Sequence, residues 1–378
     1  MNILFLLICT LDPEKGGAER VCKNLADEWR KKGNNIYFLS CCRTSDVENE
    51  GQYYFPDLEL ILCNENISFF ENFIHRFAIN VVIVSQPLDQ SNIMEFAQYV
   101  PKNVVVVSHL HNSPFGLFGY FGRIKKWKIS SYRHVRKLAL LWNRKKYRLN
   151  IDRMIQYSDK VVLLSESFKK ELCFFNKDAK DKLVAISNPI FLKENEIQKK
   201  YKEIIYVGRI NSVQKRFGDV LKIWKIVMNQ LPDWKLIIVG GGDELNYYRE
   251  KSKCMHLDRI SFEGFKSPDF YYKKATFLIM TSAYEGFGMV LVEAMQYACI
   301  PFAYDSFASI SDIIDDQIDG VIVPPFDTLS YARQIVALAN SSKIEEMQQC
   351  AIRKCSLFDA SFIAEIWLQM LNNMLFRI

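Results

Sequence analysis

Residues 277–295, FLIMTSAYEGFGMVLVEAM, combine an apolar run, a glycine loop and an apolar helical pattern in that order. The run Phe277–Met280 has the length and composition of a buried strand, and the helical pattern begins after Gly288. A strand–loop–helix junction directs unpaired backbone N–H groups beyond the strand end, and the helix dipole adds partial positive charge there. The segment therefore predicts an anion site, with phosphate as the expected occupant.

Two glutamates flank this predicted anion site. Glu285 and Glu293 are eight positions apart, which corresponds to about 12 Å along the axis if the segment is wholly helical. Each carboxylate can accept hydrogen bonds from sugar hydroxyls, so the pattern fits a nucleotide diphosphate sugar with hydroxyls at both ends. A capped helix with two exposed acids is the alternative, which the preceding strand and the Gly-Phe-Gly core disfavour.

Short apolar runs alternate with helical patterns along the whole chain, which is typical of parallel sheets built from βαβ units. The runs lie at residues 3–7, 36–39, 81–84, 104–107 and 161–164 in the first half, and at 204–207, 236–239, 277–280, 301–304 and 321–323 in the second. The rhythm breaks at Asn188-Pro189, and residues 193–202 are polar and charged, as in a linker.

We therefore expect an α/β fold of two Rossmann-like, doubly wound domains, residues 1–190 and 191–360. The pattern at residues 361–378 predicts a closing helix that packs back on the first domain. A ligand cleft is expected between the domains, at the carboxyl ends of the strands.

Length and composition agree with two globular domains. The chain has 378 residues, of which 49% are hydrophobic and 24% charged, and these values exclude disordered, collagen-like and coiled-coil proteins. Ten cysteines occur without a CxxC pair, which favours buried free thiols in a reducing compartment. No apolar run is long enough for a membrane span, and the apolar N-terminus lacks the features of a signal peptide. A cytoplasmic location is expected.

A basic loop follows the first strand of the second domain. It contains Gly208, Arg209, Lys215 and Arg216, and two or three of its cations would face the predicted phosphate site. Fixed cations can neutralise the growing charge of a diphosphate leaving group. A solvated surface loop is the alternative, and the pairing with the first motif favours a binding role.

A second glycine turn, residues 15–20, lies between the first predicted strand and helix. Its sequence is neither GxGxxG nor a Walker motif, which argues against NAD and P-loop proteins. Gly17 would let the backbone approach a ligand from the opposite wall.

Taken together, these motifs resemble the retaining glycosyltransferases of the group-one type (sequence family four), which have the two-Rossmann GT-B architecture. The resemblance rests on segments spread in order over nearly the whole chain: Gly16–Arg20, Leu164–Glu166, Ser187–Pro189, Gly208-Arg209 with Lys215, Gly240–Gly242, Phe262–Gly264 and Glu285 to Glu293 as E-x7-E. The C-terminal motifs match specifically, whereas the N-terminal half matches more loosely, as acceptor domains do.

The resemblance implies roles for individual residues. Arg209 and Lys215 match the cations that hold the donor diphosphate, Glu293 the acid that holds the ribose, and Glu285 the acid that contacts the transferred sugar. Phe287, Gly288, Met289 and Val290 match the positions whose backbone amides contact phosphate and sugar. Gly17 matches the loop that flanks the phosphates.

The family also places a histidine after a first-domain strand, near the reacting carbon. His109 and His111 both qualify, and we favour His111 because His-Asn-x-Pro is closer to the family pattern. The resemblance further implies retention of configuration, with the leaving diphosphate helping to deprotonate the acceptor. No cofactor and no essential metal are expected.

Residues 123–153 carry twelve Lys or Arg and a single acid, Asp152, a formal charge of +11 in a chain of net charge +6. Apolar residues recur among them mostly at three-residue steps, as in a basic amphipathic helix on a membrane surface. We expect either docking on an anionic leaflet, to reach a lipid-linked acceptor, or a solvated helix whose apolar stripe packs on the core.

The function predicted from the sequence is transfer of a hexose from a nucleotide sugar to a saccharide or lipid-linked acceptor, in polysaccharide or glycolipid biosynthesis. A sugar-nucleotide epimerase on a similar scaffold is the alternative among enzymes. A basic nucleic-acid-binding protein would leave the Glu285–Glu293 motif unexplained, so no nucleic-acid partner is expected. An inactive homologue is disfavoured because the motif residues are intact.

Overall fold

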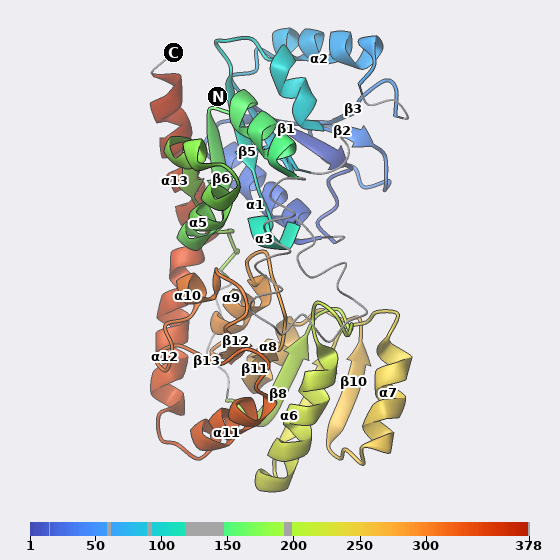
Figure 1. Cartoon of the computed structure of the whole chain (residues 1–378), viewed down its shortest axis with the longest axis vertical. Coiled ribbons are helices and arrows are strands. Elements are labelled where there is room, and N and C mark those ends of the chain that lie inside the picture. The colour runs from blue at the N-terminus through green and yellow to red at the C-terminus, as the bar shows by residue number, and fades with distance from the viewer. Residues whose placement is uncertain (15, 59–61, 89–92, 118–146, 193–198, 377–378) are drawn as a thin grey trace. The chain divides into compact units, whose positions relative to one another are not determined.

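The computed structural model describes residues 1–14, 16–58, 62–88, 93–117, 147–192 and 199–376 (Figure 1). These residues divide into two compact units. Unit 1 runs from Met1 to Phe191 and takes up the C-terminal segment from Asp359, and unit 2 runs from Leu192 to Phe358.

In its described residues, unit 1 contains a parallel sheet of seven strands in the order β3-β2-β1-β4-β5-β6-β7. The strands are β1 (Asn2–Cys9), β2 (Asn35–Cys42), β3 (Gln52–Tyr54), β4 (Val81–Ser85), β5 (Val105–His109), β6 (Lys160–Leu163) and β7 (Leu183–Ala185). Strand order reverses at β1 and β4, which is the topological switch point of a doubly wound sheet.

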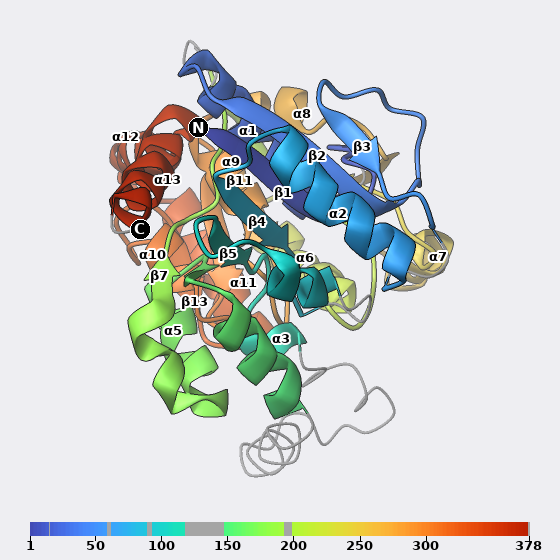
Figure 2. The same cartoon turned by 90° about the horizontal axis from the view of Figure 1, so that it is seen from above.

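The helices of unit 1 cover both faces of this sheet. They include α1 (Gly17–Lys31), α2 (Asn64–Arg76), α3 (Pro114–Leu117), α5 (Glu166–Phe175) and α13 (Ala360–Leu375), with 3-10 helices η1 (Ile93–Tyr99) and η3 (Lys177–Lys182). Residues 147–157 are helical as well. On one face, Trp29 of α1 donates from Nε1 to the carbonyl of Ala364 in α13, at 3.1 Å. Figure 2 shows α2 and α13 on opposite sides of β1, β4 and β5. The C-terminal helix therefore completes the core of unit 1.

Helix α1 follows from its sequence pattern. Val21, Leu25 and Trp29 recur at four-residue steps and are completely buried, which fixes the face turned to the sheet. The helix ends at Lys31, and Gly33 follows the C-cap residue with a φ of 78°, the left-handed conformation that commonly terminates a helix.

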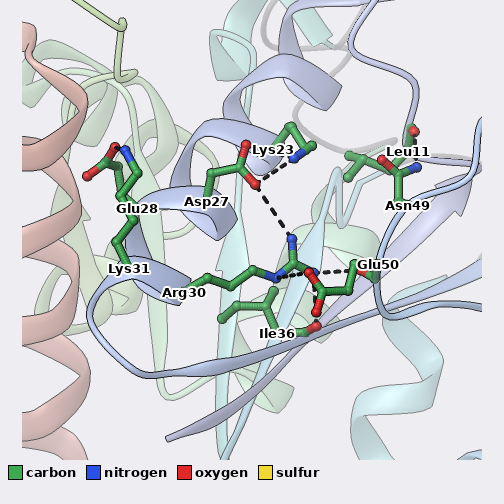
Figure 3. Close-up of polar contacts among 9 residues, drawn as sticks. All are labelled: Leu11, Lys23, Asp27, Glu28, Arg30, Lys31, Ile36, Asn49 and Glu50. Carbon is green, nitrogen blue, oxygen red and sulfur yellow. Dashed lines mark hydrogen bonds and ion pairs between the residues drawn. The ribbon is translucent and has the colours of Figure 1, made fainter.

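Polar contacts connect α1 to the loop between β2 and β3 (Figure 3). Arg30 donates from Nη2 to the Glu50 carbonyl at 2.6 Å, and Asn49 donates from Nδ2 to the Leu11 carbonyl at 2.7 Å. Because Leu11 follows β1, the bond from Asn49 fixes the start of the loop that leads to Gly17.

Within its described residues, unit 2 contains a parallel sheet of six strands in the order β10-β9-β8-β11-β12-β13. The strands are β8 (Tyr201–Val207), β9 (Lys235–Val239), β10 (Ile260–Gly264), β11 (Ala275–Met280), β12 (Ile300–Tyr304) and β13 (Val321–Val323). The helices are α6 (Phe217–Gln230), α7 (Leu245–Cys254), α8 (Asp269–Lys274), α9 (Met289–Met295), α10 (Ile310–Ile313), α11 (Thr328–Ala339) and α12 (Ile344–Cys355), followed by η4 (Ser356–Phe358).

The core of unit 2 lies between its sheet and α6 and α11. Trp224 of α6, Phe277 of β11 and Tyr331 of α11 belong to one buried cluster, and Figure 1 shows α6 running beside β8. The Tyr331 hydroxyl donates to the Phe302 carbonyl at 2.5 Å, which satisfies its polar atom inside the core. Two parallel-sheet α/β units confirm the predicted fold class.

All ten cysteines lie in the described residues, and none forms a disulfide. Four of them are buried, five are half-buried and Cys254 is exposed, so the expectation of free thiols is confirmed, and their burial is confirmed for four. No helix in the described residues combines the length and apolar character that crossing a membrane requires.

Candidate active site

Glycines bring together the loops that follow β8 and β9 in unit 2. Gly208 donates its N–H to the Val239 carbonyl at 3.0 Å, and a Cβ on Gly240 would lie only 1.9 Å from the Gly208 carbonyl oxygen. Gly240 also has a φ of 149°, in a region that side chains avoid. These glycines therefore allow the backbone contact that places Arg209.

Arg209 lies at the exposed end of this contact. Tyr206 donates its hydroxyl hydrogen to the Arg209 carbonyl at 2.8 Å, and burial raises the pKa of Tyr206, so this hydroxyl keeps its proton. The guanidinium donates from Nη2 to Oε1 of Gln214 at 3.2 Å. Both the backbone and the side chain of Arg209 are thus hydrogen-bonded to residues of unit 2.

The loop that carries Lys215 is fastened to the end of β11. Asn211 Oδ1 accepts the backbone N–H groups of Gln214 and Lys215, both at 2.9 Å. Thr281 donates its hydroxyl hydrogen to the Lys215 carbonyl at 2.8 Å, and Ala283 donates its N–H to the Gln214 carbonyl at 2.7 Å. The loops after β8 and β11 therefore form one connected surface.

Lys215 and Glu285 meet on this surface. Lys215 Nζ lies 2.5 Å from Glu285 Oε1, and the two side chains are only 16% and 11% exposed. The two residues, predicted from separate motifs, thus form a largely buried ion pair, which is far less screened by solvent than a surface pair.

Arg216 has a different environment. It adopts a left-handed conformation with φ of 47° before α6, pairs with Asp219 at 2.7 Å and lies 4.1 Å from the ring centroid of Phe326. Because Asp219 is buried, Arg216 neutralises an internal charge. Of the two or three cations expected at the site, Arg209 and Lys215 remain.

The predicted phosphate segment surrounds the start of α9. Gly288 precedes the helix with φ of 100° and provides no side-chain cap, so the first-turn N–H groups of Met289 and Val290 have no intrahelical partner. Phe287 is buried against Phe358, with 5.6 Å between ring centroids. Glu285 lies outside the helix, so the 12 Å separation calculated for a wholly helical segment does not apply.

Glu293 lies on α9 and contacts α8. Tyr272 donates its hydroxyl hydrogen to Glu293 Oε2 at 3.2 Å. Burial and the neighbouring carboxylate raise the pKa of Tyr272, so its hydroxyl remains a donor. The backbone carbonyl of Tyr272 in turn accepts from Lys200 Nζ at 2.8 Å, which fixes the residue that orients Glu293.

In unit 1, His111 lies just beyond the end of β5 and is 8% exposed. Its Nε2 is 3.0 Å from the Ser85 hydroxyl and 4.0 Å from the Cys22 sulfur. Burial lowers the pKa of His111 to about 3, so the imidazole is neutral at physiological pH.

His109, the other candidate, is the last residue of β5 and is 1% exposed. Its ring contacts that of His111, with 4.0 Å between centroids, and packs edge-on against Trp367 of α13 at 4.9 Å. Burial and the adjacent His111 lower the pKa of His109 as well. His109 thus lies behind His111, in contact with the C-terminal helix.

Gly17 is the first residue of α1 and is exposed. A Cβ at this position would meet no atom within 4 Å, whereas a Cβ on Gly16 would collide with the Glu19 carboxylate. Because the Glu19 carboxylate is the mobile end of a side chain and Gly16 has an extended backbone with φ of −163°, packing within the described chain does not require glycine at either position.

Most of the basic stretch 123–153 lies outside the described residues. Two of its twelve cations are described, and both have acidic partners. Arg148 is 3.4 Å from Asp152, and Arg153 is 2.7 Å from Glu95.

Sequence reasoning missed Ser85, Asn211, Gln214 and Tyr272, which form hydrogen bonds with the predicted site residues. Asn211 and Gln214 lie within the basic loop that was singled out, but their hydrogen bonds depend on a turn geometry that the composition does not reveal. Ser85 and Tyr272 act across strands and helices distant in sequence, and no motif marked them. Among the described residues, no three His, Cys, Asp or Glu side chains are grouped as metal ligands.

Comparison with protein families gives two matches that together span most of the chain. Residues 187–354 match the model described as "Glycosyl transferases group 1", and residues 15–194 match that of "Glycosyltransferase Family 4". The first-named segment contains the whole sheet of unit 2, and the second contains the sheet of unit 1 except β1.

Individual relatives support the same family. The amylovoran biosynthesis glycosyltransferase AmsD of Erwinia amylovora is 32% identical over 57% of this chain and 62% of its own length, so the chain matches less than two thirds of AmsD. An uncharacterized glycosyltransferase of Haemophilus influenzae is 23% identical over 81% of this chain and 82% of its own. Anabaena HepE, solved in complex with UDP and glucose, is 16% identical with a TM-score of 0.73 over 99% of this chain and 100% of its own, which shows the GT-B fold.

Proposed function

Because its family models and fold make this chain a GT-B glycosyltransferase of group 1, we propose that it transfers a hexose from a nucleotide diphosphate sugar to a saccharide or lipid-linked acceptor. The product would be part of a polysaccharide or glycolipid. The observation that carries the proposal is the buried Lys215–Glu285 pair, which joins a candidate phosphate ligand to a candidate sugar ligand.

The donor diphosphate is assigned to Arg209, Lys215 and the start of α9. Arg209 and Lys215 supply two positive charges, and the N–H groups of Phe287, Gly288, Met289 and Val290 supply donors for phosphate and sugar oxygens. Two fixed cations balance much of the charge that develops on a leaving diphosphate. The proposal therefore needs no essential metal and no cofactor.

The sugars at both ends of the diphosphate are assigned to the two glutamates. Glu293, oriented by the Tyr272 hydroxyl, would accept hydrogen bonds from the ribose. Glu285 would accept hydrogen bonds from the transferred hexose, and its ion pair with Lys215 keeps that carboxylate close to the phosphate ligand. Gly17 would flank the phosphates.

His111 is assigned to the transferred sugar. Its low pKa leaves the imidazole neutral, so it would act as a neutral hydrogen-bonding group rather than as an imidazolium ion. In unit 1 no covalent nucleophile is assigned. Cys22, 4.0 Å from His111 Nε2, is a buried thiol whose pKa is raised to about 12. We therefore propose retention by attack of the acceptor on the face that the diphosphate leaves.

The acceptor and the location of the enzyme rest on the basic stretch 123–153. We propose that its excess of positive charge holds the enzyme on an anionic cytoplasmic leaflet, beside a lipid-linked acceptor. Binding to anionic vesicles at low salt that charge reversal in this stretch abolishes would support this assignment. Absence of binding at low salt would contradict it.

The direct test is acceptor-dependent release of nucleoside diphosphate by the full-length protein. UDP-hexoses come first, because the ligands solved with the similar HepE fold are UDP and glucose, and GDP- and ADP-sugars follow. We expect release only with an oligosaccharide or lipid-linked acceptor, an α-linked product from an α-linked donor, and unchanged activity in EDTA. Conversion of the donor without any acceptor would indicate an epimerase.

A further inference from the structure

Ser85 and His111 approach each other at the ends of neighbouring strands. Ser85 is the last residue of β4, and it pairs in register with His109, the last residue of β5. The chain turns immediately afterwards, because Gln86 donates its N–H to the His109 carbonyl at 3.1 Å and adopts φ of 59°. The register therefore places Ser85 beside the residues that lead to His111.

The imidazole of His111 has one satisfied ring nitrogen. Nε2 lies 3.0 Å from the Ser85 hydroxyl, whereas Nδ1 is buried without a hydrogen-bond partner among the described residues. An unpaired buried polar atom is costly unless a ligand or water satisfies it. Nδ1 is thus the ring atom with hydrogen-bonding capacity to spare.

The neighbours of the ring do not fix its orientation on their own. His109 packs against the ring of His111 with 47° between planes, and such a contact is compatible with either orientation of the imidazole edge. A rotation of 180° about χ2 exchanges the nitrogen and carbon positions of the ring while preserving its shape. The Ser85 hydroxyl distinguishes the two orientations, because in only one does Nε2 face it.

The other polar neighbour cannot replace Ser85. Cys22 lies 3.6 Å from the Ser85 oxygen and 4.0 Å from His111 Nε2, and a thiol is a weak hydrogen-bonding group. Burial raises the pKa of Cys22 to about 12, so it presents no thiolate to the imidazole. Ser85 therefore provides the strong hydrogen bond within this buried group.

We propose that Ser85 is a positioning residue for His111, which holds the imidazole in the one orientation that leaves Nδ1 for the substrate. The inference rests on the proposed role of His111 in sugar transfer. Ser85 itself contacts no substrate in this account and acts only through the ring.

The test compares Ser85→Ala, Ser85→Thr and Ser40→Ala. Ser40 is a matched control, because it is a buried serine on β2 of the same sheet and donates its hydroxyl hydrogen to the Cys9 carbonyl at 2.9 Å. We expect Ser85→Ala to lower kcat about tenfold with a donor KM within about twofold of wild type, since misorienting a catalytic group costs rate more than binding. Ser85→Thr should restore most of kcat, and Ser40→Ala should leave it unchanged.

Two further measurements separate positioning from loss of structure. In a His111→Ala background, Ser85→Ala should cause no additional loss of kcat, because the residue acts through the ring. The ring nitrogen signals of His111 in NMR should also shift in Ser85→Ala and not in Ser40→Ala. Unchanged signals, or a full additional loss of kcat in the His111→Ala background, would overturn the inference.

The NMR measurement also distinguishes failure of the proposed function from failure of the positioning role of Ser85. If the wild type transfers no sugar but Ser85→Ala still shifts the His111 signals, the proposed function fails and the positioning contact stands. If the wild type is active and neither kcat nor the signals respond to Ser85→Ala, the positioning role is refuted and the function stands.

Discussion

Lys215 Nζ and Glu285 Oε1 are 2.5 Å apart, although the two residues are 70 positions apart in the sequence. Each comes from a loop at the carboxyl end of a strand, β8 for Lys215 and β11 for Glu285. The adjacent register of β8 and β11 explains how these loops meet. In the absence of a donor, the charge of Lys215 is balanced by a carboxylate, and a diphosphate that enters must share Lys215 with Glu285.

This sharing predicts opposite effects of Glu285→Gln on binding and on turnover. Removing the negative charge frees Lys215, so a nucleoside diphosphate should bind as tightly as in wild type or more tightly. Turnover should fall by at least about a hundredfold if Glu285 acts on the transferred sugar in the transition state. Calorimetric titration with nucleoside diphosphate measures the affinity, and steady-state kinetics give kcat. Weaker binding with unchanged kcat would contradict the assignment of Glu285 to the transferred sugar.

Substitution of the two arginines of the basic loop should affect different properties, nucleotide affinity for Arg209 and stability for Arg216. Arg209→Ala removes a candidate phosphate ligand, so nucleoside diphosphate affinity should fall while stability changes little. Arg216→Ala removes the shorter of the two ion pairs of the buried Asp219 and leaves only the more exposed Lys222 at 3.2 Å, so the unfolding midpoint should fall in the absence of ligand. Thermal unfolding with and without nucleotide distinguishes the two variants. Equal loss of affinity in both would mean that Arg216 also binds the donor.

The two buried histidines predict a dependence of stability on pH. Because their pKa values are lowered in the folded state, to about 3 for His111, the unfolded chain binds their protons first as the pH falls below about 6.5. Stability should therefore be greatest above that pH and decline toward pH 3, with a slope of up to about 1.4 kcal/mol per pH unit from each histidine.

Urea unfolding between pH 7 and pH 4 measures this slope. His111→Asn should make the decline shallower, whereas His75→Asn, at an exposed position of α2, should leave it unchanged. A His111→Asn slope equal to that of wild type would show that this imidazole becomes protonated in the folded protein.

Gly240 and Gly241 provide a matched pair for the backbone contact behind Arg209. A Cβ on Gly240 would collide with the Gly208 carbonyl, whereas one on Gly241 would meet no atom within 4 Å. Gly240→Ala should destabilise unit 2 by roughly 1–3 kcal/mol and weaken nucleotide binding, and Gly241→Ala should do neither. Similar unfolding midpoints for the two variants would contradict this account of the backbone contact between Gly208 and Gly240.

The sequence was sufficient for the central strands of both sheets. Runs such as Val81–Val84 and Phe277–Met280 are buried on both faces, so their composition alone indicates strands. Strands β3, β7 and β10 were missed, because they are edge strands whose residues are mostly half-buried. The edge strand β13, with two of its three residues buried, was predicted. The helix after the glycine loop was expected, but the position of Glu285 before its first turn depends on the conformation of Gly288.

The candidate site was predictable where a motif brings the residues together and not where the fold does. Arg209, Lys215, Glu285 and Glu293 were identified from spacing and from resemblance to the family. Their supporting contacts from Tyr206, Asn211 and Tyr272 arise between segments that are distant in sequence or depend on an exact turn, so no local pattern reveals them.

Thermal unfolding of the wild type with UDP, GDP, ADP and CMP tests the central claim most directly, alongside Lys215→Ala and Glu293→Ala. A ligand at about 100 times its dissociation constant adds about 2.7 kcal/mol to the stability, which is a clear upward shift of the midpoint. Lys222→Ala is the matched control, because Lys222 is 60% exposed and pairs with Asp219. We expect one nucleoside diphosphate to stabilise the wild type and Lys222→Ala, and to lose this effect in Lys215→Ala and Glu293→Ala. No stabilisation by any nucleotide, or equal stabilisation of all four proteins, would contradict the proposed donor site.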